Sequence, residues 1–180
     1  RDIGGVKGIA YRKNGGVILT QPRSYIHDLD ALPFPAWDLV DLNLYGRFRS
    51  MASVGLRKYM TVFTSRACPY HCIYCHNLFG KNYRTRSPEN VLREMEILVK
   101  DYGVEEFEIL DDIFNLDIPR AHAICDLIIK KKLKIGFSFP NALRGDRLPF
   151  DLLRKFKQAG LNFTSIAIET ASPRLQKLIK

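Results

Sequence analysis

Four times along this chain, a short apolar run is followed by a longer segment with the spacing of an amphipathic helix. The runs are rich in β-branched and aromatic side chains, which is typical of buried strands. The four expected strands cover residues 59–64, 106–110, 134–139 and 163–168. Strands that alternate with helices in this way form a parallel sheet with right-handed connections. The sequence therefore predicts an α/β fold whose strand ends share one edge.

The helices that follow these strands have recognisable ends. Ser87 is a typical N-cap residue, and Pro88 suits the first helical position because its missing N–H would have no partner there. Gly103 and Gly160 stand where glycine commonly ends a helix. The four expected helices cover residues 88–102, 117–132, 149–159 and the segment from 172 to the chain end, and Asp117 is expected to cap the second.

Directly after the first expected strand, three cysteines occur within eight residues: Cys68, Cys72 and Cys75. A loop with this C-x3-C-x2-C spacing brings three sulfurs to one point, where thiolates bind a soft metal or an iron–sulfur cluster. A structural site built of cysteines normally has four protein ligands, so three leave one position open for chemistry. The fourth cysteine, Cys125, lies in the second expected helix and is predicted to be a small buried hydrophobe.

Two other interpretations of the cysteines were weighed. A disulfide framework is not favoured, because three close cysteines leave one unpaired and no secretory signal opens the chain. A zinc knuckle would need His71 or His76 as its fourth ligand, and zinc accepts three thiolates and one imidazole. The loop alone does not separate zinc from an iron–sulfur cluster. Reduced cysteines at either site predict a reducing compartment, for which we expect the cytoplasm.

Polar residues follow every expected strand. They are the cysteine loop, Asp111 and Asp112, residues 138–144, and Glu169 with Thr170. Because the carboxyl ends of parallel strands meet at one rim, these groups are predicted to surround a single site. Structural roles remain open for some of them: the two aspartates would serve equally well as loop caps, and Glu169 as an ion-pair partner of Arg144.

Composition and charge narrow the function only slightly. The hydrophobic content of 46% and charged content of 26% over 180 residues are ordinary for a soluble domain with a core. No stretch approaches the length of a membrane-spanning helix. The net charge of +9 would suit nucleic acid or an anionic substrate. The lysines of residues 130–134, however, end an expected helix, where cations stabilise the helix dipole. A nucleic-acid partner is therefore not favoured.

The N-terminal part differs in character from the rest. Residues 6–12 and 17–20 flank an Asn14-Gly15 turn, which is a strong β-hairpin signal. A connector with several prolines follows, and its apolar residues are sufficient to pack on the body of the protein. We expect three regions: a hairpin at 1–27, a connector at 28–57 and a core at 58–180.

The cysteine loop resembles the cluster loop of the radical S-adenosylmethionine (radical SAM) enzymes. It follows a short strand and the residues Thr64-Ser65-Arg66, and Tyr74 fills the aromatic position beside the last cysteine. The resemblance implies that Cys68, Cys72 and Cys75 hold a 4Fe–4S cluster. The unligated iron would bind S-adenosylmethionine, and one electron from an external donor would cleave it to a 5′-deoxyadenosyl radical. It also implies a six-stranded partial (β/α) barrel, of which four strands are found here.

The resemblance also assigns the strand ends. Glu169 matches a glutamate that contacts the nucleoside or methionyl part of the cosubstrate, although Thr170 and Ala171 replace the usual Ser and Gly. Arg144 matches an arginine that meets the cosubstrate carboxylate. Asp111 and Asp112 stand where many members have Gly-Gly-Glu, and a carboxylate there can accept from the ammonium. The resemblance assigns no catalytic residue for the substrate itself.

Residues 28–41 resemble the segment that joins a cobalamin-binding domain to the radical domain in one branch of the superfamily. Residues 1–27 would then be the tail of that domain, and the core would be truncated at its C-terminus. The branch includes methylases and ring-forming enzymes of porphyrin and lipid metabolism, which implies a small-molecule substrate and possible use of cobalamin from outside this chain.

The sequence also admits two rival functions. One is a tRNA- or protein-methylthiolating radical SAM enzyme, which the positive charge favours. The other is a non-catalytic zinc or iron–sulfur binding module. In addition, a chain without the last barrel strands would expose the fourth strand as an edge, so we expect it to oligomerise or to bind S-adenosylmethionine poorly.

Overall fold

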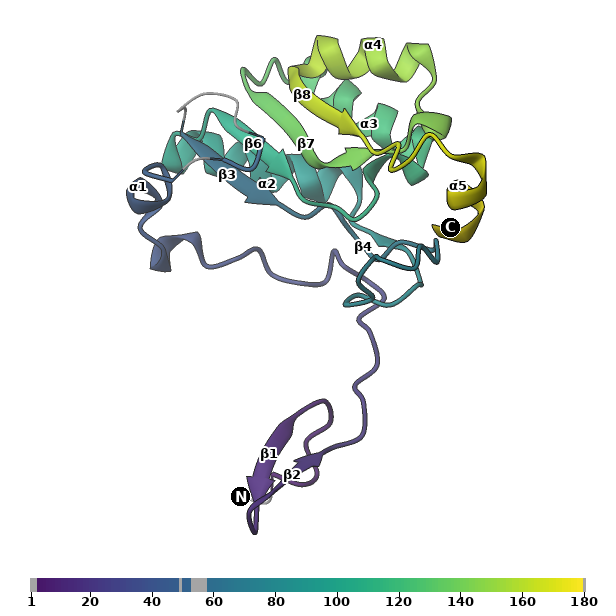
Figure 1. Ribbon diagram of the computed structural model, residues 1–180. Helices are drawn as coiled ribbons and strands as arrows, with labels where there is room; N and C mark the ends of the chain where they lie inside the picture. Colours follow the sequence, from purple (N-terminus) through teal and green to yellow (C-terminus); the bar gives the residue numbers. More distant parts are fainter. Residues whose placement is uncertain (1–2, 49, 53–57, 180) are drawn as a thin grey trace.

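A parallel four-stranded sheet forms the centre of the molecule, with its strands in chain order (Figure 1). The structure, a computed structural model, describes residues 3–48, 50–52 and 58–179. The sheet strands are β3 (Tyr59–Val62), β6 (Glu106–Ile109), β7 (Gly136–Leu143) and β8 (Leu161–Ile166). A helix follows each of the last three strands and another separates β3 from β6. The predicted α/β fold is therefore confirmed, and its architecture is that of a partial (β/α) barrel.

The helices pack on one face of this sheet and bury its apolar side chains (Figure 1). They are α2 (Pro88–Tyr102), α3 (Ile118–Lys130) and α4 (Phe150–Ala159). The short α5 (Pro173–Ile179) follows β8 and has no buried residue among those described. The predicted caps are confirmed: the Ser87 hydroxyl accepts from the Asn90 amide at 3.1 Å, and the Asp117 carboxylate accepts from the Arg120 amide at 3.0 Å. Gly103 and Gly160 end their helices with positive φ, which glycine adopts without strain.

Aromatic rings fill the core between the sheet and the helices. Phe137 and Phe139 of β7 meet Phe156 of α4 and Phe114, with ring centroids 4.7–6.4 Å apart. Cys125 is 1% exposed in this core, as predicted for a small buried hydrophobe. The core therefore lies on the helical side, which leaves the strand ends free to carry polar groups.

Three strands end two or more residues from the predicted place. The third expected strand stopped at Phe139, but β7 continues through Pro140 to Leu143. The register shifts between Phe139 and Leu143, and Ala142 has φ 70°, so an irregular stretch accommodates the proline, which lacks a ladder N–H. Residues 140–143, expected beyond the strand, thus lie within it. In contrast, β3 ends at Val62 and β8 ends at Ile166, each two residues early.

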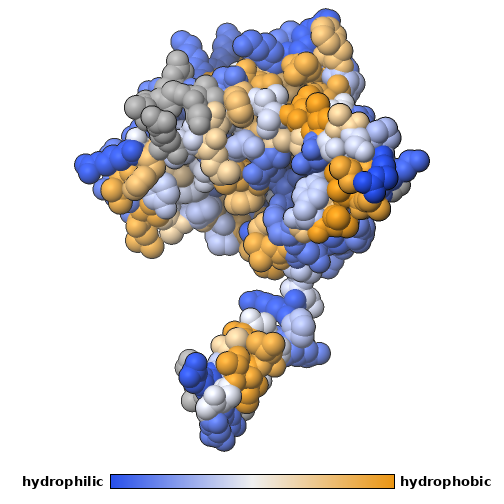
Figure 2. Space-filling view, viewed as in Figure 1, coloured by the Kyte–Doolittle hydropathy of each residue, from blue (hydrophilic) through white to orange (hydrophobic). Residues whose placement is uncertain are grey.

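An antiparallel hairpin stands apart from the sheet at the N-terminus (Figure 1). Its strands are β1 (Ala10–Lys13) and β2 (Gly16–Leu19), shorter than expected but joined by the predicted turn, with positive φ at Asn14 and Gly15. Its apolar side chains are exposed, and they form the orange surface on the hairpin in Figure 2.

The arm between the hairpin and the sheet contacts the end of the cysteine loop. The Asp30 carboxylate accepts from the Ser87 amide at 2.9 Å, and the Ile26 carbonyl accepts from Arg84 at 2.8 Å. The arm contains a short 3₁₀ turn, Trp37–Leu39, and α1, Leu42–Tyr45. The expected regions 1–27, 28–57 and 58–180 stay a prediction, and parts of them (1–2, 49, 53–57 and 180) lie outside the described residues.

In the part of the chain that the structure describes, no helix has the length and apolar character needed to cross a membrane.

Candidate functional site

The three clustered cysteines lie on a closed loop that leaves the sheet after β3 and returns before α2. The loop is closed by two short strands, β4 (Ser65–Arg66) and β5 (Arg84–Thr85), which pair antiparallel. The Thr64 carbonyl also accepts from the Arg86 amide at 2.9 Å. The loop therefore starts and ends at one place, at the carboxyl end of the sheet.

Cys68, Cys72 and Cys75 line one hollow of about 260 Å³. They also line an adjoining hollow of about 270 Å³, which is bounded by residues from the ends of three sheet strands. Those residues include Asp112 after β6, Arg144 after β7 and Glu169 after β8. The structure thus brings the predicted cysteines, Tyr74 and three of the four predicted polar contacts around one site.

The surroundings of Cys68 and Cys75 favour the neutral thiol. Burial raises the pKa of Cys68, and the nearby Lys81 ammonium opposes that rise. Burial and the neighbouring Cys72 raise the pKa of Cys75. A metal or cluster that bound here would therefore displace protons, so its binding is expected to weaken as the pH falls.

The donor set fits an iron–sulfur cluster. Among the described residues, no three His, Cys, Asp or Glu side chains surround the position of a single metal ion. Instead, three thiol sulfurs border a hollow that is larger than one ion. Cysteine thiolates are the usual ligands of 4Fe–4S clusters. Of the two histidines considered for zinc, His76 lines the first hollow and His71 is exposed on the loop.

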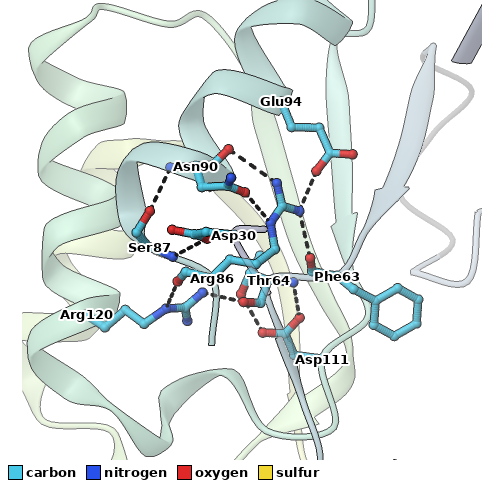
Figure 3. A network of polar contacts seen from close by, with 9 residues as sticks. All are labelled: Asp30, Phe63, Thr64, Arg86, Ser87, Asn90, Glu94, Asp111 and Arg120. Atoms are coloured by element: carbon cyan, nitrogen blue, oxygen red, sulfur yellow. Dashed lines mark hydrogen bonds and ion pairs between the residues drawn. The ribbon is translucent and has the colours of Figure 1, made fainter. Parts of the chain in front are cut away.

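The two aspartates after β6 have different surroundings. Asp111 is 3% exposed, and it accepts hydrogen bonds from the Thr64 amide and hydroxyl at 2.5–2.6 Å (Figure 3). It also accepts from the Ser65 hydroxyl at 2.6 Å. Asp112 lines both hollows, and its Oδ1 lies 3.3 Å from Nε2 of His76. Asp111 therefore fixes the base of the loop, which was the capping alternative left open, whereas Asp112 borders the hollows.

Arg144 is held by a tyrosine of the cysteine loop and by an aspartate of its own segment. Its guanidinium carbon lies 3.9 Å from the ring centroid of Tyr70. Its Nε and Nη2 each donate to Asp146 at 2.9 Å. The ion pair between Arg144 and Glu169, left open from the sequence, is replaced by this bidentate pair with Asp146. The guanidinium still borders the second hollow.

Glu169 meets the cysteine loop through Tyr74. Loss of solvent around the phenol, together with its hydrogen bond to Glu169, raises the pKa of Tyr74 to about 12. Glu169 has φ 63°, a conformation that costs free energy for a side chain of this type. The contact joins two predicted site residues that are far apart in sequence.

Three residues of the site had no individual role assigned from the sequence, although Tyr70 and Asn141 lie in segments expected at the rim. Tyr70 and Asn141 line both hollows, and Lys81 lines the first. The Lys81 ammonium donates to the Tyr70 carbonyl, and the Asn141 amide donates to the Leu110 carbonyl at 3.0 Å. The sequence pointed to Tyr70 and Asn141 only through the segments that contain them, and it gave no signal for Lys81.

Comparisons with known proteins agree with this arrangement. A family model described as "Radical SAM superfamily" matches residues 62–180. The chain is 34% identical to an uncharacterized methyltransferase of Pyrococcus horikoshii over 99% of its own length and 38% of the relative's. It is 28% identical to the cytidylyl-2-hydroxyethylphosphonate methyltransferase of Streptomyces wedmorensis, over 97% of this chain and 37% of that one.

A third relative has a different kind of reaction in its name. The anaerobic magnesium-protoporphyrin IX monomethyl ester cyclase of Synechocystis is 28% identical over 99% of this chain. The chain spans 35% of that cyclase, so it covers well under half of each of the three relatives.

Proposed function

The chain belongs to the radical SAM superfamily, and from that premise we propose that it is the cluster-bearing part of a longer S-adenosylmethionine-dependent enzyme. The observation that carries the proposal is the convergence of three thiols with Asp112, Arg144 and Glu169 around adjoining hollows. When bound, a 4Fe–4S cluster supplies the electron that cleaves the sulfonium of S-adenosylmethionine, after reduction by an external donor.

In this proposal, the thiolates of Cys68, Cys72 and Cys75 hold the cluster, and the strand ends orient the cosubstrate. Asp112 accepts from the ammonium, because it lines both hollows and Asp111 is engaged at the loop base. Arg144 binds the cosubstrate carboxylate. In this structure its guanidinium donates to the Asp146 carboxylate in that role. Charge-assisted bonds of this kind are strong and directional.

Tyr74 and Glu169 form the wall on the nucleoside side of the same proposed site. Their hydrogen bond connects the cysteine loop to the segment after β8. A nucleoside hydroxyl is a suitable donor to the Glu169 carboxylate, and the Tyr74 ring is a suitable apolar surface for the cosubstrate.

We propose methyl transfer or ring closure on a small molecule as the reaction of the whole protein. The names of the relatives support this choice over methylthiolation of tRNA or protein, since they are methyltransferases and a cyclase. Use of cobalamin is a further proposal, which rests on the resemblance of residues 28–41 to the linker of the cobalamin branch. The unpaired thiols suit a reducing compartment, for which we propose the cytoplasm.

Metal analysis tests the proposal most directly. After anaerobic reconstitution, we expect about four irons per chain and a reduced electron spin resonance signal that changes when S-adenosylmethionine is added. Cys68→Ala should abolish both results. Cys125→Ala is the matched control and should keep them, because Cys125 is buried in the helical core.

A different metal content would overturn the proposal. One zinc per chain, no iron and no response to S-adenosylmethionine would identify a zinc module. In that case His76→Ala should release the metal, whereas a cluster held by three cysteines should survive this substitution.

A further inference from the structure

The cysteine loop has little structure of its own to hold its two ends together. Its only internal ladder among the described residues is the pairing of β4 with β5, which joins Ser65 to Thr85 and Arg66 to Arg84. A two-stranded pairing this short is not stable alone in water. The positions of the cysteines therefore depend on contacts from outside the loop that hold its base.

Arg120 of α3 supplies such contacts to both ends of the loop at once. Its Nη2 donates to the Thr64 carbonyl at 2.6 Å, where the chain enters the loop. Its Nε donates to the Arg86 carbonyl at 2.8 Å, where the chain leaves it (Figure 3). The planar guanidinium carries its donors in a fixed fork, so one arginine side chain can bind both carbonyls at once. A lysine ammonium cannot reproduce this geometry.

The same base is held from the opposite side by Asp111. Its three hydrogen bonds end on Thr64 and Ser65, while Arg120 binds the carbonyl of Thr64. The opposite charges of the carboxylate and the guanidinium favour both ionised forms, against the burial that disfavours them. Asp111, from the segment after β6, and Arg120, from α3, thus both bind the backbone segment at which the loop begins.

Arg120 is 6% exposed and does not line the hollows around the cysteines. Burying a guanidinium costs free energy, and hydrogen bonds to well-placed acceptors offset that cost. Here the two acceptors are the backbone carbonyls that bracket the cysteine loop. The helical core alone does not require an arginine at this position, because its neighbours on the inner face of α3 are apolar.

We propose that Arg120 is a positioning residue that clasps the two ends of the cysteine loop, with Asp111 as its counterpart, and so holds Cys68, Cys72 and Cys75 around one hollow before any cluster enters. This inference deepens the proposed function and rests on it for the role of the cysteines. Arg120 acts through the backbone at Thr64 and Arg86, and touches neither cofactor nor cosubstrate.

Hydrogen exchange on the whole chain in its metal-free form tests the clasp. In Arg120→Met, the amides of the β4–β5 pairing and of Arg86 should exchange about tenfold faster or more, since two hydrogen bonds from a charged donor are lost. The amides of β7 and α4 should keep their wild-type rates. Arg120→Lys should resemble the methionine variant at the loop, because it keeps the charge but not the fork.

Ile124→Val is the matched control. It lies one turn further along the same helix, is 1% exposed and removes one core methyl group. Its loop amides should exchange as in the wild type. Equal exchange of the loop amides in Arg120→Met and the wild type would overturn the proposal. A uniform increase over the loop, β7 and α4 would also overturn it, because it would show a general stabilising role.

Cluster assembly gives a second readout that separates this inference from the proposed function. After reconstitution, Arg120→Lys should bind less iron than Ile124→Val and give a broader reduced electron spin resonance signal. If the wild type itself binds no iron, the proposed function fails. The exchange measurement on the metal-free chain still decides whether Arg120 clasps the loop.

Discussion

Tyr70 connects the cysteine loop to the end of β7 through two arginines. Arg144 lies over its ring at 3.9 Å, and Nε of Arg147 donates to its hydroxyl at 3.1 Å. Its carbonyl accepts from Lys81. One residue of the loop, two positions after Cys68, thus carries three contacts that differ in kind.

These contacts predict an order of stability for substitutions at Tyr70. Tyr70→Phe should lower the free energy of unfolding by about 1 kcal/mol, because it removes one hydrogen bond and keeps the ring beneath Arg144. Tyr70→Ala should cost about 1 kcal/mol more, because the cation–π contact and the ring burial are also lost. Urea unfolding monitored by circular dichroism measures both. Equal stability of the alanine and phenylalanine variants would contradict the role given to the ring.

Tyr74 and Glu169 predict a dependence on alkaline pH. The pKa of the Tyr74 phenol is raised to about 12 by loss of solvent and by its bond to Glu169. A group whose pKa is higher in the folded state than in the unfolded state favours folding while it is protonated. The contribution of this pair is therefore present below about pH 10 and is lost as the pH rises toward 12.

The measurement is a phenolate absorbance titration of the wild type and of Tyr74→Phe, whose difference isolates Tyr74. When the same comparison is made in the Glu169→Gln background, Tyr74 should titrate at lower pH, since the carboxylate charge that opposes ionisation is gone. Thr170→Val, beside the glutamate, serves as the control and should leave the titration unchanged. A titration of Tyr74 that is identical in Glu169→Gln would show that the two side chains do not interact.

At the scale of elements, the two aspartates after β6 are expected to have different roles, Asp111 in stability and Asp112 in binding of the cosubstrate. Asp111→Asn replaces an acceptor oxygen by a donor among the buried donors of Thr64 and Ser65, so it should lower the free energy of unfolding by about 2–3 kcal/mol. Asp112→Asn should leave stability within about 0.5 kcal/mol, because Asp112 borders the hollows.

Asp112→Asn should instead weaken the binding of S-adenosylmethionine to the reconstituted chain, which calorimetry measures. We expect the affinity to fall about tenfold or more, since a charge-assisted bond to the ammonium is lost. Unchanged affinity in Asp112→Asn would remove this residue from the proposed cosubstrate site while leaving its structural description intact.

At the scale of the whole molecule, β8 is an edge of the sheet. An unpaired strand edge offers backbone groups to a second chain. The chain is therefore predicted to self-associate, which light scattering after size-exclusion chromatography would show as a mass that rises with concentration. A single monomer mass at all concentrations would contradict the prediction.

Two isoleucines provide a matched pair for that prediction. Ile166 is 48% exposed within β8, and Ile168 is 70% exposed just beyond it. Ile166→Lys places a charge on the edge strand and should reduce association. Ile168→Lys adds the same charge off the strand and should not. Equal effects would point to an apolar surface contact in place of edge pairing.

Local signals in the sequence determined the elements of this protein and the chemistry of its loop. The hydrophobic periods and caps, such as Ser87 and Asp117, act over a few residues, and the Asn14-Gly15 turn is equally local. The spacing of the three cysteines likewise predicted a thiol site after the first core strand, and the strand order placed Asp112, Arg144 and Glu169 beside it.

Only the tertiary structure decided which of these polar groups face the site and which support it. The sequence could not distinguish Asp111 from Asp112, because adjacent residues differ in burial only once β6 is packed against Thr64. The sequence also predicted that the third strand ends at Phe139, before Pro140, since the irregular pairing with β8 that tolerates this proline is a long-range feature. Arg120 had no local signature at all, because its acceptors are backbone carbonyls brought to it by the fold.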